Sequence, residues 1–161
     1  MQTCIRALQE WGYNVRIGST VGGNSANYFS GNDEERLQDF QQMLDDDDVK
    51  AILCARGGYG TGRIIDKIDF RKFRKNPKWI IGFSDITVLH SHLYSVHSIS
   101  SIHGPMAAAF NDDARPDDPG GREYKNEYVL SLKNAMEGKN RMNRIQMRME
   151  NSNITKSDDP F

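Results

Sequence analysis

The sequence predicts an α/β domain with a mostly parallel sheet and helices on both of its faces. Two observations carry this prediction: helix-like and strand-like patterns alternate along the chain, and the strand-like runs are almost continuously apolar. A strand that is apolar throughout is typical of a parallel sheet covered on both faces. The alternation then requires right-handed crossover connections between the strands. With 161 residues, the chain has room for one ordinary domain.

The first predicted element is an amphipathic helix over residues 2–11, where apolar side chains recur at helical spacing. Gly12 ends this helix, and residues 14–17 are expected to form a short strand. The pattern opens on a helix with no strand before it. We interpret this as a domain whose first β-strand is missing.

A second helix follows a loop at 18–32 that is rich in Gly, Ser and Asn. Asn32 or Asp33 can cap it, and its acidic first turn suits the positive end of the helix dipole. Its expected buried stripe is Leu37, Phe40, Met43 and Leu44. The adjacent carboxylates at 45–48 could suggest a cation site, but consecutive residues at a helix end point in different directions. We therefore expect a solvated turn that ends the helix, and no metal.

The central part of the chain is predicted to alternate strands and helices. The expected elements are a strand at 49–55, a helix at 61–68, a strand at 79–81, a helix that buries Ile86, Leu89, Leu93 and Val96, and a strand at 98–102. Glycine-containing turns follow the first two of these strands, at 56–60 and 82–85. Ligands of parallel sheets bind beyond the carboxyl ends of strands, so topology alone places both turns on one edge.

The C-terminal part holds a loop at 114–121 and a last helix at 123–136, with Tyr124, Tyr128, Leu132 and Met136 aligned on one face. Beyond Gly138 the sequence is polar and without a clear period. We therefore divide the chain into a domain at 1–138 and a polar tail or linker at 139–161.

Composition narrows the class of protein. Lys and Arg number 21 against 22 Asp and Glu, and the net charge of −1 gives no reason to expect a nucleic-acid or membrane-surface partner. No apolar run approaches the roughly 18–20 residues that span a bilayer. Cys4 and Cys54 lie in apolar contexts, so we expect buried thiols, no disulfide and a reducing cytoplasm.

The strongest chemical signal is the Gly-x-Ser turn at 82–84, where an apolar strand passes directly into a helix. Such an elbow presents a serine hydroxyl, here that of Ser84, as a nucleophile. It also leaves the amide of the next residue, Asp85, free to face a developing oxyanion. A simple connecting loop is the alternative for a lone serine in a glycine turn.

The glycine turn at 56–60 could cradle an anion through its backbone amides. It lacks the Lys-Ser/Thr pair of a nucleotide P-loop and the glycine spacing of a dinucleotide site. A structural tight turn stays open as an alternative. A receiver or mononucleotide domain is a weaker one, because the acidic run at 45–48 precedes a strand instead of following it.

Several separated motifs resemble the serine LD-carboxypeptidases (murein tetrapeptide carboxypeptidases), a family that includes the microcin C immunity peptidases. The matching stretches are Cys54-Ala55-Arg56-Gly57-Gly58-Tyr59-Gly60, Asn76-Pro77-Lys78-Trp79-Ile80-Ile81, Gly82-Phe83-Ser84-Asp85-Ile86-Thr87 and His103-Gly104-Pro105-Met106. The resemblance covers about residues 1–138. It implies a flavodoxin-like or amidotransferase-like three-layer fold in a cytoplasmic bacterial protein that needs no cofactor and forms a homodimer when complete.

The resemblance also implies roles for individual residues. Ser84 would be the acyl nucleophile, and its oxyanion would be held by the amide of Asp85 and by that of Gly57 or Gly58. We expect the Asp85 carboxylate to help cap the helix and not to orient a base.

Family members carry the catalytic Glu and His in a C-terminal domain, which we expect to be absent from this chain. The helix carries His90 and His92 away from Ser84, and His97 lies near the helix end. His103, at a strand end, is the one histidine with a plausible position near the site. The isolated chain is therefore expected to be inactive.

The implied reaction is release of the terminal D-alanine from muropeptides during peptidoglycan recycling. Cleavage of a peptidyl-nucleotide, as in the immunity peptidases, is one alternative. A non-catalytic module that binds a muropeptide or small peptide through the same glycine turns is another.

Overall fold

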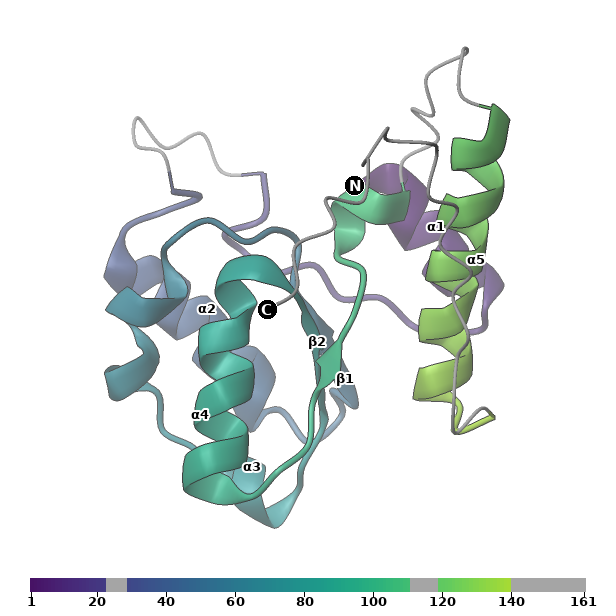
Figure 1. Cartoon of the computed structure of the whole chain (residues 1–161). Coiled ribbons are helices and arrows are strands. Elements are labelled where there is room, and N and C mark those ends of the chain that lie inside the picture. Colours follow the sequence, from purple (N-terminus) through teal and green to yellow (C-terminus); the bar gives the residue numbers. More distant parts are fainter. Residues whose placement is uncertain (23–28, 111–118, 140–161) are drawn as a thin grey trace, which may run out of the picture.

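The computed structural model describes residues 1–22, 29–110 and 119–139, and it confirms the predicted α/β class. Strands β1 (Ala51–Leu53), β2 (Trp79–Gly82) and β3 (Ile102–His103) form one parallel sheet in the order β1-β2-β3. The sheet lies between two layers of helices (Figure 1). The domain division at 138/139 stays a prediction.

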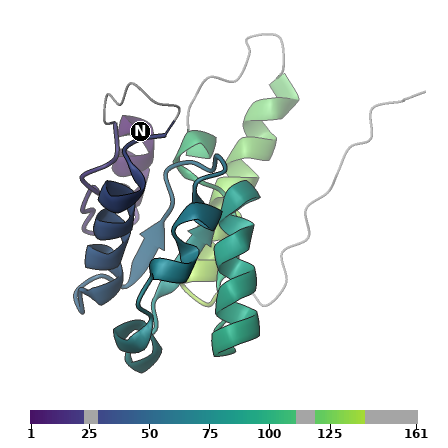
Figure 2. The same cartoon turned by 90° about the vertical axis from the view of Figure 1, so that its left-hand side faces the viewer.

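The two helical layers pack on opposite faces of the sheet. The first layer holds α2 (Asp33–Asp45), α3 (Arg71–Lys75) and α4 (Thr87–His97), with the 3-10 turns η1 (Thr61–Arg63), η2 (Ile65–Lys67) and η3 (Ser84–Ile86). The second layer holds α1 (Gln2–Glu10), α5 (Pro119–Met136) and the 3-10 turn η4 (Ala107–Phe110). Figure 2 shows α2 and α4 in front of the strands. Because side chains alternate along a strand, Ile80 enters the core on the α2–α4 side and Ile81 the core on the α1–α5 side.

Helix α2 begins and ends as predicted. The Asn32 side chain accepts a hydrogen bond from the Glu35 amide, and the Glu35 carboxylate accepts one from the Asn32 amide, each at 2.8 Å. The acidic run ends the helix, where the buried Lys78 ammonium donates to the carbonyls of Met43 (3.2 Å) and Asp46 (2.6 Å). Burial lowers the pKa of Lys78.

The strand predicted at 14–17 is absent. This segment is held by an ion pair between Arg16 and Asp46, and a cavity separates it from β1. The strand predicted at 49–55 is limited to β1, whose residues are half-buried instead of covered on both faces. The reason is its place at the edge of the sheet, where the same cavity opens beside it.

The helix predicted at 61–68 is replaced by the two 3-10 turns η1 and η2. Ile64, Ile65 and Ile68 are buried as a helical spacing suggests, but hydrogen bonds join residues three apart, such as Lys67 N to Ile64 O at 3.0 Å. On so short a segment, the spacing of three buried side chains is compatible with an α-helix and with 3-10 turns, so the sequence pattern could not distinguish them.

Two further expectations near α4 need correction. Val96, predicted to be buried, is 60% exposed, because the last turn of α4 packs through His97 against Phe70, at 4.9 Å between ring centroids. The strand predicted at 98–102 is shorter and later, at β3.

The other differences lie at short or C-terminal segments. Helix α3 was not predicted, because its five residues bury one side chain, Phe73, and so show no period.

Helix α5 begins at Pro119, so the last residues of the loop expected at 114–121 belong to this helix. Proline is favoured at the first helical position. The rest of that loop, the side chain of Tyr124 and the tail at 140–161 lie outside what is described.

Asp39 in α2 binds the segment at Ser19 and Thr20 through its carboxylate. Its buried carboxylate accepts hydrogen bonds from Ser19 N (2.8 Å), Thr20 N (3.0 Å) and Thr20 Oγ1 (2.6 Å). Burial raises the pKa of Asp39, but the hydrogen bonds outweigh burial and hold the pKa below its ordinary value.

Asp39→Asn should destabilise the domain by about 1–3 kcal/mol at pH 7, because the amide cannot accept all three bonds as a carboxylate does. A pKa lowered in the folded state gives stability that is present above the unfolded value of 3.8 and is lost as the pH falls through the folded value. Urea unfolding at pH 7 and pH 3 should therefore show a smaller acid loss for Asp39→Asn than for the unmodified protein. The exposed Asp66→Asn is the control, and equal acid losses in all three proteins would contradict the role of Asp39.

Candidate active site

The two glycine-containing turns meet at the carboxyl edge of the sheet, as predicted. A methyl group at Gly57 would lie 3.3 Å from Ser84 Cβ, and 3.4 Å from both Ser84 Oγ and Asp85 N. The parallel pairing of Leu53 with Ile81 places the two strand ends side by side and so produces this contact. The residue at 57 must be small because any side chain would press on the Ser84 turn.

Ser84 occupies the turn in a left-handed conformation, with φ of 60°, and its side chain is exposed. A non-glycine residue in this region costs about 1–2 kcal/mol. Gly82 lies over Ile86, where an added methyl would meet the isoleucine at 3.0 Å. In the facing turn, Gly58 (φ 124°) and Tyr59 (φ 57°) also have positive φ. Both turns are therefore sharply bent, and the serine hydroxyl stands out from the sheet edge.

Asp85 joins the two turns through its carboxylate. Asp85 Oδ2 accepts a hydrogen bond from Thr61 N at 2.8 Å, at the start of η1. We expected this carboxylate to cap its own helix; it caps the 3-10 turn across the site instead. Its backbone amide is left on the Gly57 side.

His90 lies closer to the turn than the sequence suggested. Its Nε2 is 3.0 Å from the Gly82 carbonyl oxygen and its Nδ1 is 2.7 Å from Ser101 Oγ. A carbonyl can only accept, so Nε2 carries the proton and Nδ1 accepts from the serine when the ring is neutral. Helical side chains point back toward the helix N-terminus, and this direction brings the ring under the turn. Both ring nitrogens are engaged, so His90 is a poor base for Ser84.

The remaining histidines divide into two groups. The rings of His92 and His97 pack against Phe70 on the α2–α4 side of the sheet, His92 stacked at 5.3 Å and His97 tilted at 4.9 Å between ring centroids. His103 is exposed at the end of β3, and its ring lies 6.4 Å from that of Phe83. Within the described residues, no hydrogen bond reaches Ser84 Oγ, so none of these histidines is seen to activate it.

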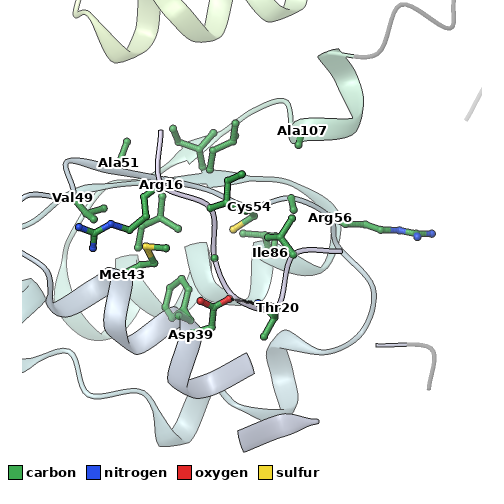
Figure 3. Close-up of a pocket in the computed structure, with 18 of the residues that line it drawn as sticks. Arg16, Thr20, Asp39, Met43, Val49, Ala51, Cys54, Arg56, Ile86 and Ala107 are labelled. Atoms are coloured by element: carbon green, nitrogen blue, oxygen red, sulfur yellow. Dashed lines mark hydrogen bonds between the residues drawn. The ribbon is translucent and has the colours of Figure 1, made fainter. Parts of the chain in front are cut away.

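A cavity of about 1980 Å³ runs along the free edge of β1 and reaches the glycine turn at Arg56, Gly57 and Gly58. Figure 3 shows Cys54 beside this cavity and the Arg56 side chain extending away from it. Burial raises the pKa of the Cys54 thiol to about 12 and that of Cys4 to about 11. Both cysteines are free, as predicted, and their thiols stay protonated near neutral pH.

Across the described part of the chain, no cluster of three His, Cys, Asp or Glu side chains is placed to hold a metal ion. No helix in this part of the chain is both long enough and apolar enough to span a membrane.

Residues 1–104 match the family described as the LD-carboxypeptidase N-terminal domain. The chain belongs to this family. Among curated relatives, the probable murein peptide carboxypeptidase of Bacillus subtilis is 45% identical over 66% of this chain and 33% of its own length. The murein tetrapeptide carboxypeptidase of Pseudomonas aeruginosa is 35% identical over 66% of this chain and 34% of its own length. The chain thus spans about a third of the length of these relatives.

Solved structures share the fold of this LD-carboxypeptidase domain. The muramoyltetrapeptide carboxypeptidase of Oxalobacter formigenes matches with a TM-score of 0.65 and 28% identity, over 84% of this chain and 42% of that one. The microcin C7 self-immunity protein MccF matches with a TM-score of 0.72 over 84% of this chain and 38% of its own; at 24% identity it supports the fold alone. These neighbours confirm the predicted three-layer architecture.

Gly57→Ala should destabilise the domain by about 1–3 kcal/mol, because the added methyl must displace the Ser84 turn. Gly62→Ala is the matched control, since nothing lies within 4 Å of a methyl there. Urea unfolding should place the control within about 1 kcal/mol of the unmodified protein. Equal effects at the two glycines would contradict the close contact at Gly57.

Ser84→Gly should stabilise the domain by about 1 kcal/mol, because glycine adopts positive φ without strain. Ser84→Ala removes the same hydroxyl and keeps the strain, so its unfolding free energy should stay below that of Ser84→Gly. Chemical denaturation of both variants makes the comparison. If the two are equally stable, the turn at Ser84 is not strained.

Proposed function

We propose that this chain is the nucleophile-bearing domain of a serine LD-carboxypeptidase that releases the terminal D-alanine from muropeptides in peptidoglycan recycling. The observation that carries the proposal is the contact of the Gly57 turn with Ser84 and Asp85 N. The proposal is supported by the exposed Ser84 hydroxyl and the Asp85 amide, which lie beside the Gly57 turn at the sheet edge. A developing oxyanion needs two donors about 3 Å from one point.

In the proposed reaction, Ser84 Oγ attacks the carbonyl carbon of the bond to D-alanine and loses its proton to a base. The amides of Asp85 and of Gly57 or Gly58 hold the oxyanion. The C–N bond then breaks, and D-alanine leaves as the amine after accepting a proton. Water hydrolyses the acyl-serine ester and restores the hydroxyl. The bent backbone at Ser84, held by the Gly82 and Asp85 hydrogen bonds, keeps the hydroxyl in place through both steps.

The base is proposed to come from outside the described residues. His90 is engaged at both nitrogens, and His92 and His97 lie against Phe70. His103 is exposed near Phe83 and is better placed to face the substrate than to activate Ser84. A Glu and His pair from a second domain, as the family resemblance implies, would complete the site.

The same proposal includes the cellular compartment and the partners of the enzyme. The free, protonated thiols of Cys4 and Cys54 suit a reducing compartment, and we propose the bacterial cytoplasm. The partner would be a muropeptide or small peptide, and the complete protein would be a homodimer.

Cleavage of a peptidyl-nucleotide is the second candidate. The microcin C7 self-immunity protein MccF of Escherichia coli is 30% identical over 63% of this chain and 29% of its own length. Solved structures of MccF include complexes with adenosine monophosphate and with aspartyl sulfamoyl adenosine. Both reactions use the same nucleophile, so the substrate and not Ser84 distinguishes them. A non-catalytic binding module would bind a muropeptide or small peptide without using Ser84 as a nucleophile.

The test is a chimera in which residues 1–104 of this chain replace the matching part of the Bacillus subtilis relative. We expect release of D-alanine from a tetrapeptide muropeptide, and a loss of at least about 1000-fold with Ser84→Ala. Ser91→Ala, on the exposed face of α4, is the matched control and should retain activity.

A folded chimera that lacks activity toward both the muropeptide and aspartyl sulfamoyl adenosine would support the binding module instead. Activity toward the nucleotide alone would support the second candidate. Release of D-alanine by the 161-residue protein itself, abolished by Ser84→Ala, would contradict a base outside the described residues.

A further inference from the structure

A cluster of charged side chains lies beside the glycine turn, at the start of α2. The Asp33 carboxylate accepts hydrogen bonds from Arg63 Nε at 2.9 and 3.0 Å, and the second ion pair of the same carboxylate is with Arg36, at 2.5 Å. Both guanidinium groups lie over the Phe29 ring, with their carbon atoms 4.9 Å (Arg36) and 5.6 Å (Arg63) from its centroid. We call Phe29, Asp33, Arg36 and Arg63 the Asp33 cluster.

The Asp33 cluster contacts the last residue of the glycine turn. The Arg36 guanidinium fills the space that a side chain at Gly60 would need, since a methyl there would lie 2.9 Å from Arg36 Cζ. Gly60 has φ of −93°, so the guanidinium and not the backbone conformation favours glycine at this position. Arg63 belongs to η1, which begins at Thr61 directly after the turn. The cluster therefore joins α2 to the end of the turn and to the 3-10 turn that follows.

The conformation of the glycine turn requires support from its neighbours. Gly58 and Tyr59 both have positive φ, and this conformation is strained for tyrosine. The Tyr59 side chain is 82% exposed, so its own packing contributes little to the shape of the turn. At the end of the turn, Thr61 N donates to Asp85 Oδ2 at 2.8 Å, next to Ser84. Contacts thus run from the Asp33 cluster through η1 to the turn that carries the serine.

We propose that Asp33 is a positioning residue for the reaction at Ser84, because its cluster holds the glycine turn in place against the serine turn. This inference rests on the proposed function, in which an amide of Gly57 or Gly58 meets the oxyanion. Hydrogen bonds from Arg63 lower the pKa of Asp33, so the carboxylate is ionised near neutral pH. Ion pairs near the surface contribute little to stability. The loss of this charge should therefore change the rate of the reaction more than the free energy of unfolding.

The first test is hydrogen exchange in the 161-residue protein with Asp33→Asn, which keeps the size of the side chain and removes its charge. Exchange at the Thr61 amide should become at least tenfold faster, because η1 is held less firmly against α2. Asp69→Asn is the matched control, since Asp69 forms an ion pair with Arg71 at 2.5 Å and its backbone binds Gln41, farther along α2. Unchanged exchange at Thr61 in Asp33→Asn, or equal acceleration in both variants, would overturn the inference.

The second test measures kinetics in the chimera that carries residues 1–104. Asp33→Asn should lower kcat for release of D-alanine at least about tenfold and leave KM within about twofold, because the oxyanion forms only in the transition state. Glu34→Gln removes a charge from the same first turn of α2, so it controls for the helix dipole and should retain kcat. A higher KM with unchanged kcat, or equal losses of kcat in the two variants, contradicts a positioning role. If the chimera is inactive before either change, the proposed function fails, and exchange at Thr61 alone decides whether Asp33 holds the turn.

Discussion

Contact between Gly57 and the Ser84–Asp85 backbone is the constraint on which the rest of the site depends. It needs β1 and β2 paired in parallel so that Leu53 and Ile81 end together. It also favours glycine at 57, because a methyl there would stand 3.3 Å from Ser84 Cβ, which is closer than most methyl contacts. The Asp85–Thr61 hydrogen bond then fixes the distance between the two turns. Register, residue size and one carboxylate together set the spacing of the two turns at the sheet edge.

The bent backbone at Ser84 is stabilised by hydrogen bonds to the Gly82 carbonyl as well as by the Asp85–Thr61 hydrogen bond. The Gly82 carbonyl accepts from His90 Nε2 and from Gly104 N, each at 3.0 Å, and so ties the end of β2 to both α4 and β3. Each such hydrogen bond contributes about 1 kcal/mol, which is comparable with the strain of one left-handed residue. Ser101, bound to His90 Nδ1, sets the orientation of the ring. The elbow is therefore a product of three elements and not of the turn sequence alone.

The fold could be predicted from the sequence where apolar residues recur with a regular period or where the topology of the sheet allows one arrangement. Parallel strands force the turns after β1 and β2 onto one edge, so the neighbourhood of Gly57 and Ser84 could be predicted without coordinates. Short or long-range features could not. Helix α3 buries a single residue, residues 14–17 form no strand, and the two turns of 3-10 helix bury the same isoleucines as an α-helix would. The His90–Ser101 bond depends on a side-chain direction that residue spacing along the helix does not convey.

The Asp85–Thr61 bond has a consequence for the order in which the chain folds. It joins residues 24 apart in sequence, and the loop between them contains η1, η2, α3 and β2. Closing such a loop costs chain entropy before any contact compensates for it, so contacts of this kind form after the local helices. An intermediate with α2 and α4 formed but β1 and β2 unpaired would carry Ser84 in an unconstrained segment. The turn at Ser84 therefore reaches its final conformation only after β1 and β2 have paired.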